Sequence, residues 1–298
     1  MKYIGLLDCN NFFVSCERLF RPDLWDRPTV VLSSNDGCVV ARSLEVKDMG
    51  IPMGVPYFQI KKELQAADTA VFSSNFQLYR DISRRVMDVL KQEVGKVEQY
   101  SVDESFFEVL GTRKEVEAQL IAVKAAVESK VGMPVSVGAA KTKTIAKYAS
   151  EYQKRGTGYC LLTGESWQAL VEELPIGKIW GVGGKTQIKL REQGVNTVAD
   201  FLAIDPARLK NIYGIGGLRL QSELNELPVH KLGGRKELQK SIMSTRSFSA
   251  TTTDLATLRD SLTYHIEHAA TELRGLEAVT QSMRVLIGTN RHSEWLLR

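Results

Sequence analysis

Short apolar runs alternate with amphipathic helical patterns through the first 165 residues, and this alternation restricts the possible folds more than any other feature of the chain. Each run has the length of a strand and is bounded by turn-forming residues. Strands are expected at Tyr3–Leu7, Pro28–Leu32, Cys38–Ala41, Val97–Ser101, Ser105–Leu110, Pro134–Gly138 and Gly158–Leu162. A helix is expected from Asn10 or Asn11 to Phe20, and another follows the strand at Cys38–Ala41 and ends at about Met49. Further helices are expected over 74–94, Glu115–Val131 and Thr142–Gln153. The pattern predicts an α+β sheet covered by helices on one face.

The sequence pattern changes after Leu174: strand patterns stop, and short helical patterns are joined by glycine-rich turns. Two turns are alike, Gly181-Val182-Gly183-Gly184 and Gly214-Ile215-Gly216-Gly217, and helices are expected after them at Lys185–Gln193 and Leu218–Leu227. Free backbone N–H groups at the start of a helix can bind phosphate. The repeat predicts a paired helix-hairpin-helix module that grips a duplex backbone without reading its sequence.

A polar, basic segment, Leu232-Gly233-Gly234-Arg235-Lys236, has the composition of a linker. Beyond it the pattern predicts a strand at Ser241–Ser249, a long helix at Asp254–Leu273 and a strand at Thr280–Ile287. One strand–helix–strand unit is therefore expected in this part of the chain.

The positive charge of the chain is concentrated in one region. Between Pro175 and Lys240, Lys and Arg number 11 and Asp and Glu 6, whereas the rest of the chain has 28 and 29. A local basic excess attracts a polyanion such as nucleic acid, although a solvated surface would have the same composition.

The overall composition is that of a globular protein, with 43% hydrophobic and 25% charged residues. No apolar run approaches the roughly 20 residues that span a bilayer, and Asp8 comes too early for a signal peptide. The four cysteines form no CxxC pair. We expect a soluble cytoplasmic protein with reduced thiols and no association with membranes.

Three carboxylates occupy positions where acids are unusual. Asp8 ends a buried strand, and Asp103 and Glu104 form the tip of an apolar hairpin. If the strands are neighbours, the three acids converge, and like charges so close favour binding of divalent cations. Oxygen ligands suit Mg²⁺, and two such ions would support phosphoryl transfer. Taken singly, neither motif indicates a site, because an acid pair in a turn is usually a solvated turn.

Lys47 and Lys154 are candidates for contact with the phosphates of a nucleotide, because an ammonium group acts as a point charge. Either lysine could also be a solvated surface residue.

Several motifs in the same order together resemble the Y-family translesion DNA polymerases, and most closely those of the UmuC type. The motifs are Asp8–Glu17, Ser33–Arg42, Ser73–Phe76, Tyr100–Glu104 and Val137–Lys143. The resemblance runs from residue 1 to about residue 287. It implies a multidomain right-hand polymerase with palm, fingers, thumb and little finger. The implied boundaries are 1–12 and 74–165 for the palm, 13–73 for the fingers, 166–232 for the helix-hairpin-helix thumb, 233–240 for a linker and 241–298 for an incomplete little finger.

The resemblance also implies a role for each matching residue. Asp8, Asp103 and Glu104 fall on the catalytic metal-binding carboxylates, and the main-chain carbonyl of Cys9 on a further ligand for two Mg²⁺ ions. Phe13 falls on the gate that selects the sugar, and Phe12 packs beneath the nucleotide. Lys47 and Lys154 fall on triphosphate-binding positions. The expected DNA-binding residues are Gly181, Gly183, Gly184, Lys185, Gly214, Gly216, Gly217, Arg235 and Lys236.

The implied activity is template-directed, low-fidelity DNA synthesis from dNTPs on primer-template DNA, with bypass of damaged bases. The resemblance further implies a UmuD-type dimer, a recombinase filament and a sliding clamp as partners. Two alternatives remain open. A shortened, non-catalytic relative would bind primer ends as a regulatory module, but it would not need three unneutralised acids. A nuclease or nucleotide cyclase would explain the acids, but not Phe13 or the paired glycine turns.

Overall fold

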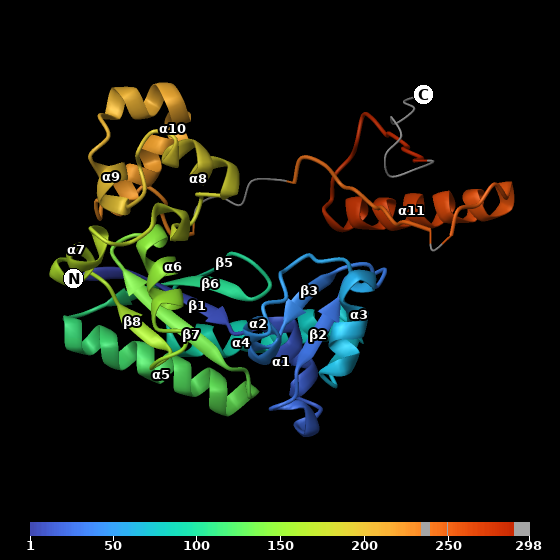
Figure 1. Cartoon of the computed structure of the whole chain (residues 1–298), viewed down its shortest axis with the longest axis horizontal. Coiled ribbons are helices and arrows are strands. Elements are labelled where there is room, and N and C mark those ends of the chain that lie inside the picture. Colours follow the sequence, from blue (N-terminus) through green and yellow to red (C-terminus); the bar gives the residue numbers. More distant parts are fainter. Residues whose placement is uncertain (234–238, 249, 289–298) are drawn as a thin grey trace. The chain divides into compact units, whose positions relative to one another are not determined.

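A computed structural model of the chain describes residues 1–233, 239–248 and 250–288. The chain divides into two compact units, Met1–Arg235 and Lys236–Arg298, which are described separately (Figure 1). In the described ranges, no helix combines the length and the apolar character that crossing a membrane requires.

The first unit is built around a five-stranded sheet with the strand order β5-β6-β1-β7-β8. Its strands are β1 (Lys2–Cys9), β5 (Val97–Gln99), β6 (Glu104–Leu110), β7 (Val135–Ala140) and β8 (Tyr159–Leu161). The central strand β1 pairs antiparallel with both β6 and β7, and β7 pairs parallel with β8. The strands predicted for this sheet are all present, and the hairpin of β5 and β6 is confirmed.

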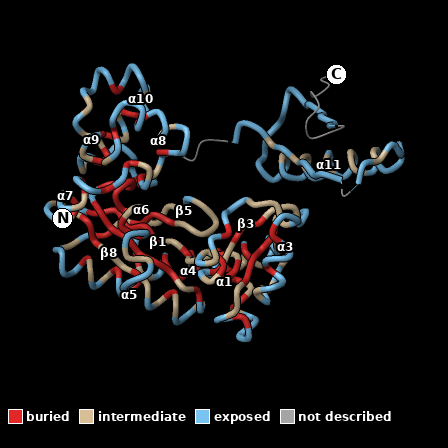
Figure 2. Tube along the Cα trace, viewed as in Figure 1, coloured by how far each residue is buried: buried red, intermediate tan, exposed pale blue. Residues whose placement is uncertain are grey.

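Helices cover both faces of this sheet. α4 (Phe76–Glu93) and α5 (Arg113–Val131) pack with Tyr3 and Leu7 in one core, and α6 (Lys143–Tyr152) packs with Ile4 and Leu6 in another. Successive residues of a strand point to opposite faces, so β1 supplies both cores. Figure 2 shows that buried residues are concentrated along the strands of this sheet. The prediction of a single covered face is therefore wrong: the unbroken apolar run of β1 reflects burial on both sides.

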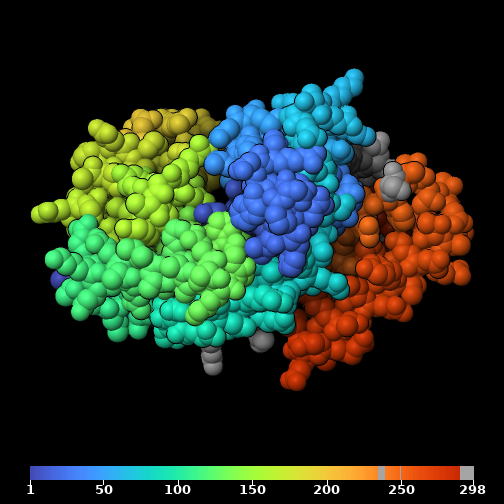
Figure 3. Space-filling view, turned by 90° about the horizontal axis from the view of Figure 1, so that it is seen from below, coloured from blue at the N-terminus to red at the C-terminus, as the bar shows by residue number. Residues whose placement is uncertain are grey.

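A second, three-stranded sheet lies within residues 29–73, with the order β3-β2-β4. Its strands are β2 (Thr29–Leu32), β3 (Val39–Arg42) and β4 (Ala70–Ser73), and the nearby helices are α1 (Phe12–Arg18), η1 (Pro22–Leu24), α2 (Leu44–Asp48) and α3 (Tyr57–Ala66). A separate small core joins this sheet to α2 and α3. Figure 3 shows the first unit hollowed between the blue surface of its N-terminal segments and the green surface of the larger sheet region.

Residues 164–225 form helices and connecting turns, as the short helical patterns between the glycine turns predict. The elements are α7 (Glu165–Val171), η2 (Ile176–Lys178), α8 (Gly184–Arg191), α9 (Val198–Leu202) and α10 (Pro206–Leu224). The second glycine turn lies inside α10 as a kink, because Gly214 has φ 63° and ψ −158°. The predicted helix at Leu218–Leu227 is thus the second half of a longer, bent element.

The described part of the second unit contains α11 (Leu255–Gly275), close to the predicted helix, with the Asp254 side chain capping its N-terminus. The strands predicted at Ser241–Ser249 and Thr280–Ile287 are wrong: 241–248 and 280–287 contain no strand, and Ser249 lies outside the described residues. α11 buries none of its residues. Two isolated strands have few partners for their backbone groups and little apolar surface to cover, so a pair of them is only marginally stable.

The close approach of α6 to β7 depends on Gly138. A Cβ at this position would lie 2.2 Å from the backbone nitrogen of Ser150 and 2.4 Å from the carbonyl oxygen of Ala146. Gly138→Ala should therefore lower the free energy of unfolding by about 3 kcal/mol, because the backbone of a packed helix must move. Gly95→Ala, where nothing lies within 4 Å, should change it by less than about 0.5 kcal/mol. Urea unfolding of the two variants measures the difference, and equal stabilities would contradict it.

Candidate active site

The pairing of β1 with β6 determines where the acids lie. Asp8 is directly opposite Glu104 in the register, and the N–H of Cys9 donates to the carbonyl oxygen of Asp103 at 2.9 Å. Asp8 and Glu104 follow the same alternation as Ile4 and Leu6, so they face α6. The Asp103 carboxylate instead accepts a hydrogen bond from the Ser101 hydroxyl at 2.6 Å. The structure thus brings Asp8 and Glu104 together and leaves Asp103 bonded within the hairpin tip.

The electrostatics of Asp8 reflect its burial. Loss of water raises the pKa of its carboxyl to about 6, Lys154 opposes this rise, and the neighbouring Glu104 adds to it. Lys154 Nζ donates to Asp8 Oδ1 at 2.9 Å and also pairs with Glu151 at 3.1 Å. Burial alone would lower the pKa of Lys154, but the charges of Asp8 and Glu151 outweigh it and raise the pKa. The site therefore holds negative charge that one lysine only partly compensates.

Lys47 joins the same group from α2. Its Nζ donates to Asn11 Oδ1 at 2.5 Å, and its pKa is lowered by burial and by the nearby charge of Lys154. The structure thus places both lysines predicted to contact phosphate beside the acids, although they lie far apart in the sequence. In the part of the chain that the structure describes, Lys47 is bonded to a neutral amide and not to a carboxylate, so its charge can attract a further anion.

Lys147, which the sequence analysis did not single out, also reaches the acids. Its Nζ donates to both carboxylate oxygens of Glu104, at 2.8 and 2.6 Å. The spacing of seven residues between Lys147 and Lys154 corresponds to about two helical turns, so both lie on the same side of the α6 region. This spacing is the signal by which the residue could have been found.

The oxygen ligands of this site fit a divalent cation chemically, because hard carboxylate oxygens with excess negative charge are suitable ligands for Mg²⁺. In the described ranges, however, no three or more Asp, Glu, His or Cys side chains are grouped so that they could hold a metal ion. Two of the three acids are paired with lysines and the third with Ser101.

Aromatic side chains of α1 and α4 form a stack. Phe12 is buried in the core, whereas Phe13 is half-buried and stacks on Tyr79, with ring centroids 4.4 Å apart and an angle of 15° between the planes. Phe76 meets the Phe13 ring edge-on at 6.0 Å. Phe76 and Tyr79 were not predicted as site residues, but their spacing of three on a helix places them on the same face.

The glycine turns differ in how open their backbones are. A Cβ at Gly181, Gly183, Gly184, Gly214 or Gly216 would meet nothing within 4 Å. Gly181 and Gly214 have φ values of +92° and +63°, a region that favours glycine. Gly217 is different, because a Cβ there would meet Tyr213 at 2.8 Å and Leu209 at 3.2 Å. Gly217 therefore serves the packing of α10. Lys185 is exposed, and Arg235 and Lys236 lie outside the described residues.

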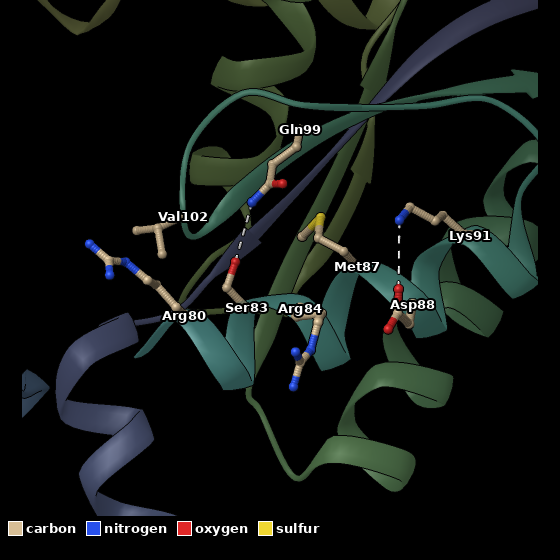
Figure 4. A pocket seen from close by; sticks show the side chains of 8 residues that line it. All are labelled: Arg80, Ser83, Arg84, Met87, Asp88, Lys91, Gln99 and Val102. Atoms are coloured by element: carbon tan, nitrogen blue, oxygen red, sulfur yellow. Dashed lines mark hydrogen bonds and ion pairs between the residues drawn. The ribbon is translucent and has the colours of Figure 1, made fainter. Parts of the chain in front are cut away.

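A hollow of about 410 Å³ lies on the α4 side of the acidic hairpin (Figure 4). Its lining residues are Arg80, Ser83, Arg84, Met87, Asp88, Lys91, Gln99 and Val102. Gln99 Nε2 donates to Ser83 Oγ at 3.4 Å, and Lys91 pairs with Asp88 at 3.6 Å. The hollow adjoins Asp103 through Val102 but includes none of the predicted site residues.

The chain is similar to known proteins over most of its length. The impB/mucB/samB family profile matches residues 7–151, and the helix-hairpin-helix motif of the same family matches 164–195. Protein ImpB of Salmonella typhimurium is 34% identical over 96% of this chain and 69% of its own length. Protein UmuC of S. typhimurium strain LT2 is 36% identical over 91% of this chain and 66% of its own. DNA polymerase IV of Corynebacterium diphtheriae is 35% identical over 67% of this chain and 45% of its own.

Solved structures have the same fold. The insertion ternary complex of Dbh DNA polymerase matches with a TM-score of 0.70 at 23% identity, over 91% of this chain and 80% of that one. DinB from Sulfolobus solfataricus matches with a TM-score of 0.65 at 22% identity over the same shares.

The similarity to UmuC and to DNA polymerase IV places the chain in the class of Y-family translesion DNA polymerases. The acidic hairpin in the larger sheet, the second small sheet and the helix-hairpin-helix segment agree with that class. Within that class the chain belongs to the impB/mucB/samB family. The resemblance seen in the motifs and the predicted fold class are both confirmed.

The ring of Tyr79 supports Phe13, and its hydroxyl donates to Glu17 Oε1 at 2.8 Å. Tyr79→Phe keeps the ring but removes this donor, so it should lower the free energy of unfolding by about 1 kcal/mol. Tyr79→Ala also removes the buried ring and should cost about 4 kcal/mol.

Tyr148→Phe is the matched control, since among the described residues the Tyr148 hydroxyl has no hydrogen-bond partner; it should change stability by less than about 0.5 kcal/mol. Chemical unfolding at pH 7 tests the order of the three variants. A loss in Tyr148→Phe equal to that in Tyr79→Phe would show that the bond to Glu17 contributes nothing.

Proposed function

We propose that this chain extends a DNA primer against a template, with low fidelity and across damaged bases, by transferring nucleotides from dNTPs. The observation that carries the proposal is the register that sets Asp8 opposite Glu104, beside the ammonium groups of Lys47 and Lys154. Paired acids next to paired cations suit a reaction in which a triphosphate and a metal are bound together.

Asp8, Asp103, Glu104 and the main-chain carbonyl of Cys9 would hold two Mg²⁺ ions. Bound ions would stabilise the negative charge that develops on the attacking and leaving oxygens during phosphoryl transfer. The raised pKa of Asp8 supports this assignment, because burial and Glu104 both disfavour its charged form in the absence of a cation. The Ser101 hydroxyl bonds only Oδ1 of Asp103, and an ionised carboxylate accepts further ligands, so all three acids could act together.

Lys47 and Lys154 would bind the β- and γ-phosphates of the nucleotide as point charges. Phe13 would lie against the sugar of the nucleotide, held by its stack on Tyr79, so that a ribose 2′-hydroxyl would collide with the ring. Phe12, which is buried, would pack beneath the nucleotide and fix the position of α1. These residues bind and orient the substrate.

The domain boundaries of the family fit the observed elements. We assign residues 1–12 and 74–165, which contain the larger sheet, to the palm and 13–73, which contain the smaller sheet, to the fingers. The helical residues 166–232 would be the thumb, with the open glycine turns and Lys185 against the DNA backbone. Residues 233–240 would be the linker, of which 234–238 lie outside the described residues, and 241–298 the little finger.

Primer-template DNA and a dNTP are the partners that this activity requires, and bacterial DNA in the cytoplasm is the place where it would act. A UmuD-type dimer, a recombinase filament and a sliding clamp are further proposed partners, supported by the similarity to UmuC.

Primer extension tests the proposal. With Mg²⁺ and each dNTP in turn, the protein should add the nucleotide that the template specifies, and Asp103→Ala/Glu104→Ala should add none, because the metal ligands are lost. Glu108→Gln, four residues further along the same strand and paired with Lys2, should extend normally.

Two results would contradict the proposal. DNA binding without extension by the unmodified protein would favour a non-catalytic binding module, and strand cleavage would favour a nuclease.

Phe13→Ala should admit ribonucleotides while DNA synthesis continues, because the ring that meets the 2′-hydroxyl is removed. The ratio of kcat/KM for rNTP to that for dNTP should rise at least about tenfold. Phe13→Tyr, which keeps the bulk and the stack on Tyr79, should leave the ratio near that of the unmodified protein. Steady-state incorporation opposite one template base measures the ratio, and an unchanged value in Phe13→Ala would remove Phe13 from this role.

A further inference from the structure

Lys147 is bonded to Glu104 more closely than a surface ion pair would be. Its ammonium donates to both carboxylate oxygens, at 2.8 and 2.6 Å, and the two side chains are only 26% and 13% exposed. Ion pairs in full contact with water contribute little, because solvent screens them and both side chains remain mobile. A charged bond to both oxygens in a mostly buried setting also fixes how the carboxylate is turned.

Two aromatic rings hold the ammonium from the other side. Lys147 Nζ lies 5.1 Å from the centre of the Tyr100 ring and 5.6 Å from that of Trp180, and the two rings meet edge-on at 5.4 Å. A cation is attracted to the face of an aromatic ring at such distances. Tyr100 precedes the acidic tip, whereas Trp180 belongs to the helical segment after β8. The lysine therefore joins Glu104 to two separate parts of the first unit.

Each of the two acids that face each other across β1 and β6 is paired with a different lysine. Asp8 is bonded to Lys154 and Glu104 to Lys147, although the two acids face each other in the register. Without Lys147, Glu104 would be a mostly buried carboxylate beside Asp8 with no cation of its own, which is costly and leaves its orientation free. Lys143, one turn earlier on α6, is bonded instead to Glu98 at 2.5 Å and lies over Phe106 at 4.9 Å.

We propose that Lys147 is a positioning residue for the polymerase reaction. Held by Tyr100 and Trp180, it keeps the Glu104 carboxylate turned toward Asp8 so that the two acids are already arranged when a metal binds. This inference rests on the proposed function. Lys147 acts through Glu104 and does not itself contact the substrate.

The first test is kinetic. At saturating Mg²⁺, Lys147→Met should lower kcat about 10- to 100-fold, the size of effect seen when a residue that orients a metal ligand is removed. The KM for dNTP and the affinity for primer-template should stay near their normal values, because neither ligand is bound by this lysine. Lys143→Met is the matched control and should retain normal kcat. A normal kcat in Lys147→Met, or an equal loss in Lys143→Met, would overturn the proposal.

The second test uses no metal and no substrate. In the presence of EDTA, Lys147→Met should lower the melting temperature, and adding Glu104→Gln to it should recover much of the loss, because the unpaired charge is then gone. No recovery in the double variant would overturn the pairing. Since this readout does not need polymerisation, recovery in a protein that cannot extend primers would refute the proposed function and leave the pairing intact.

Discussion

Two carboxylates face each other across β1 and β6, and the arrangement of the first unit follows from that contact. Asp8 and Glu104 belong to the face of the sheet that α6 covers, so water is largely excluded and repulsion between them is weakly screened. Burial raises the pKa of Asp8 to about 6 despite the attraction of Lys154. The fold therefore has to supply cations close by, and it does so from α6 and from the residues just after it.

The packing of α6 makes this supply possible. Gly138 allows the helix backbone to come close to β7, and from there Lys147 reaches Glu104 while Lys154, just beyond the helix, reaches Asp8. A helix held further away would leave the two lysines too far from the acids. The register of β1 and β6 brings the two acids together, and the close approach of α6 brings the two lysines to them.

Much of this could be predicted from the sequence, because strand-length apolar runs and helical periodicity are local signals. β1 and the hairpin of β5 and β6 followed directly, and with them the expectation that Asp8 meets the acidic tip. Pairing partners of single side chains are not local. The spacing of seven residues to Lys154 places Lys147 on the side of α6 that faces the acids, but the sequence does not show that Lys147 is bonded to Glu104 and Lys143 to Glu98. Likewise β4 was missed because it is an edge strand in which no residue is buried.

The glycine turns and the second unit also show that local sequence patterns do not reveal tertiary contacts. Gly217 shares a repeated motif with Gly184, yet Gly217 is buried against Tyr213 and Leu209 of the bent helix α10, whereas Gly184 is exposed and open. The strands expected around α11 had a suitable pattern but no covered apolar surface. A strand pattern predicts a strand only when another element can pair with it. The strands that carry the acids of the first unit meet this condition, because β1 and β6 are each paired with a strand on both sides.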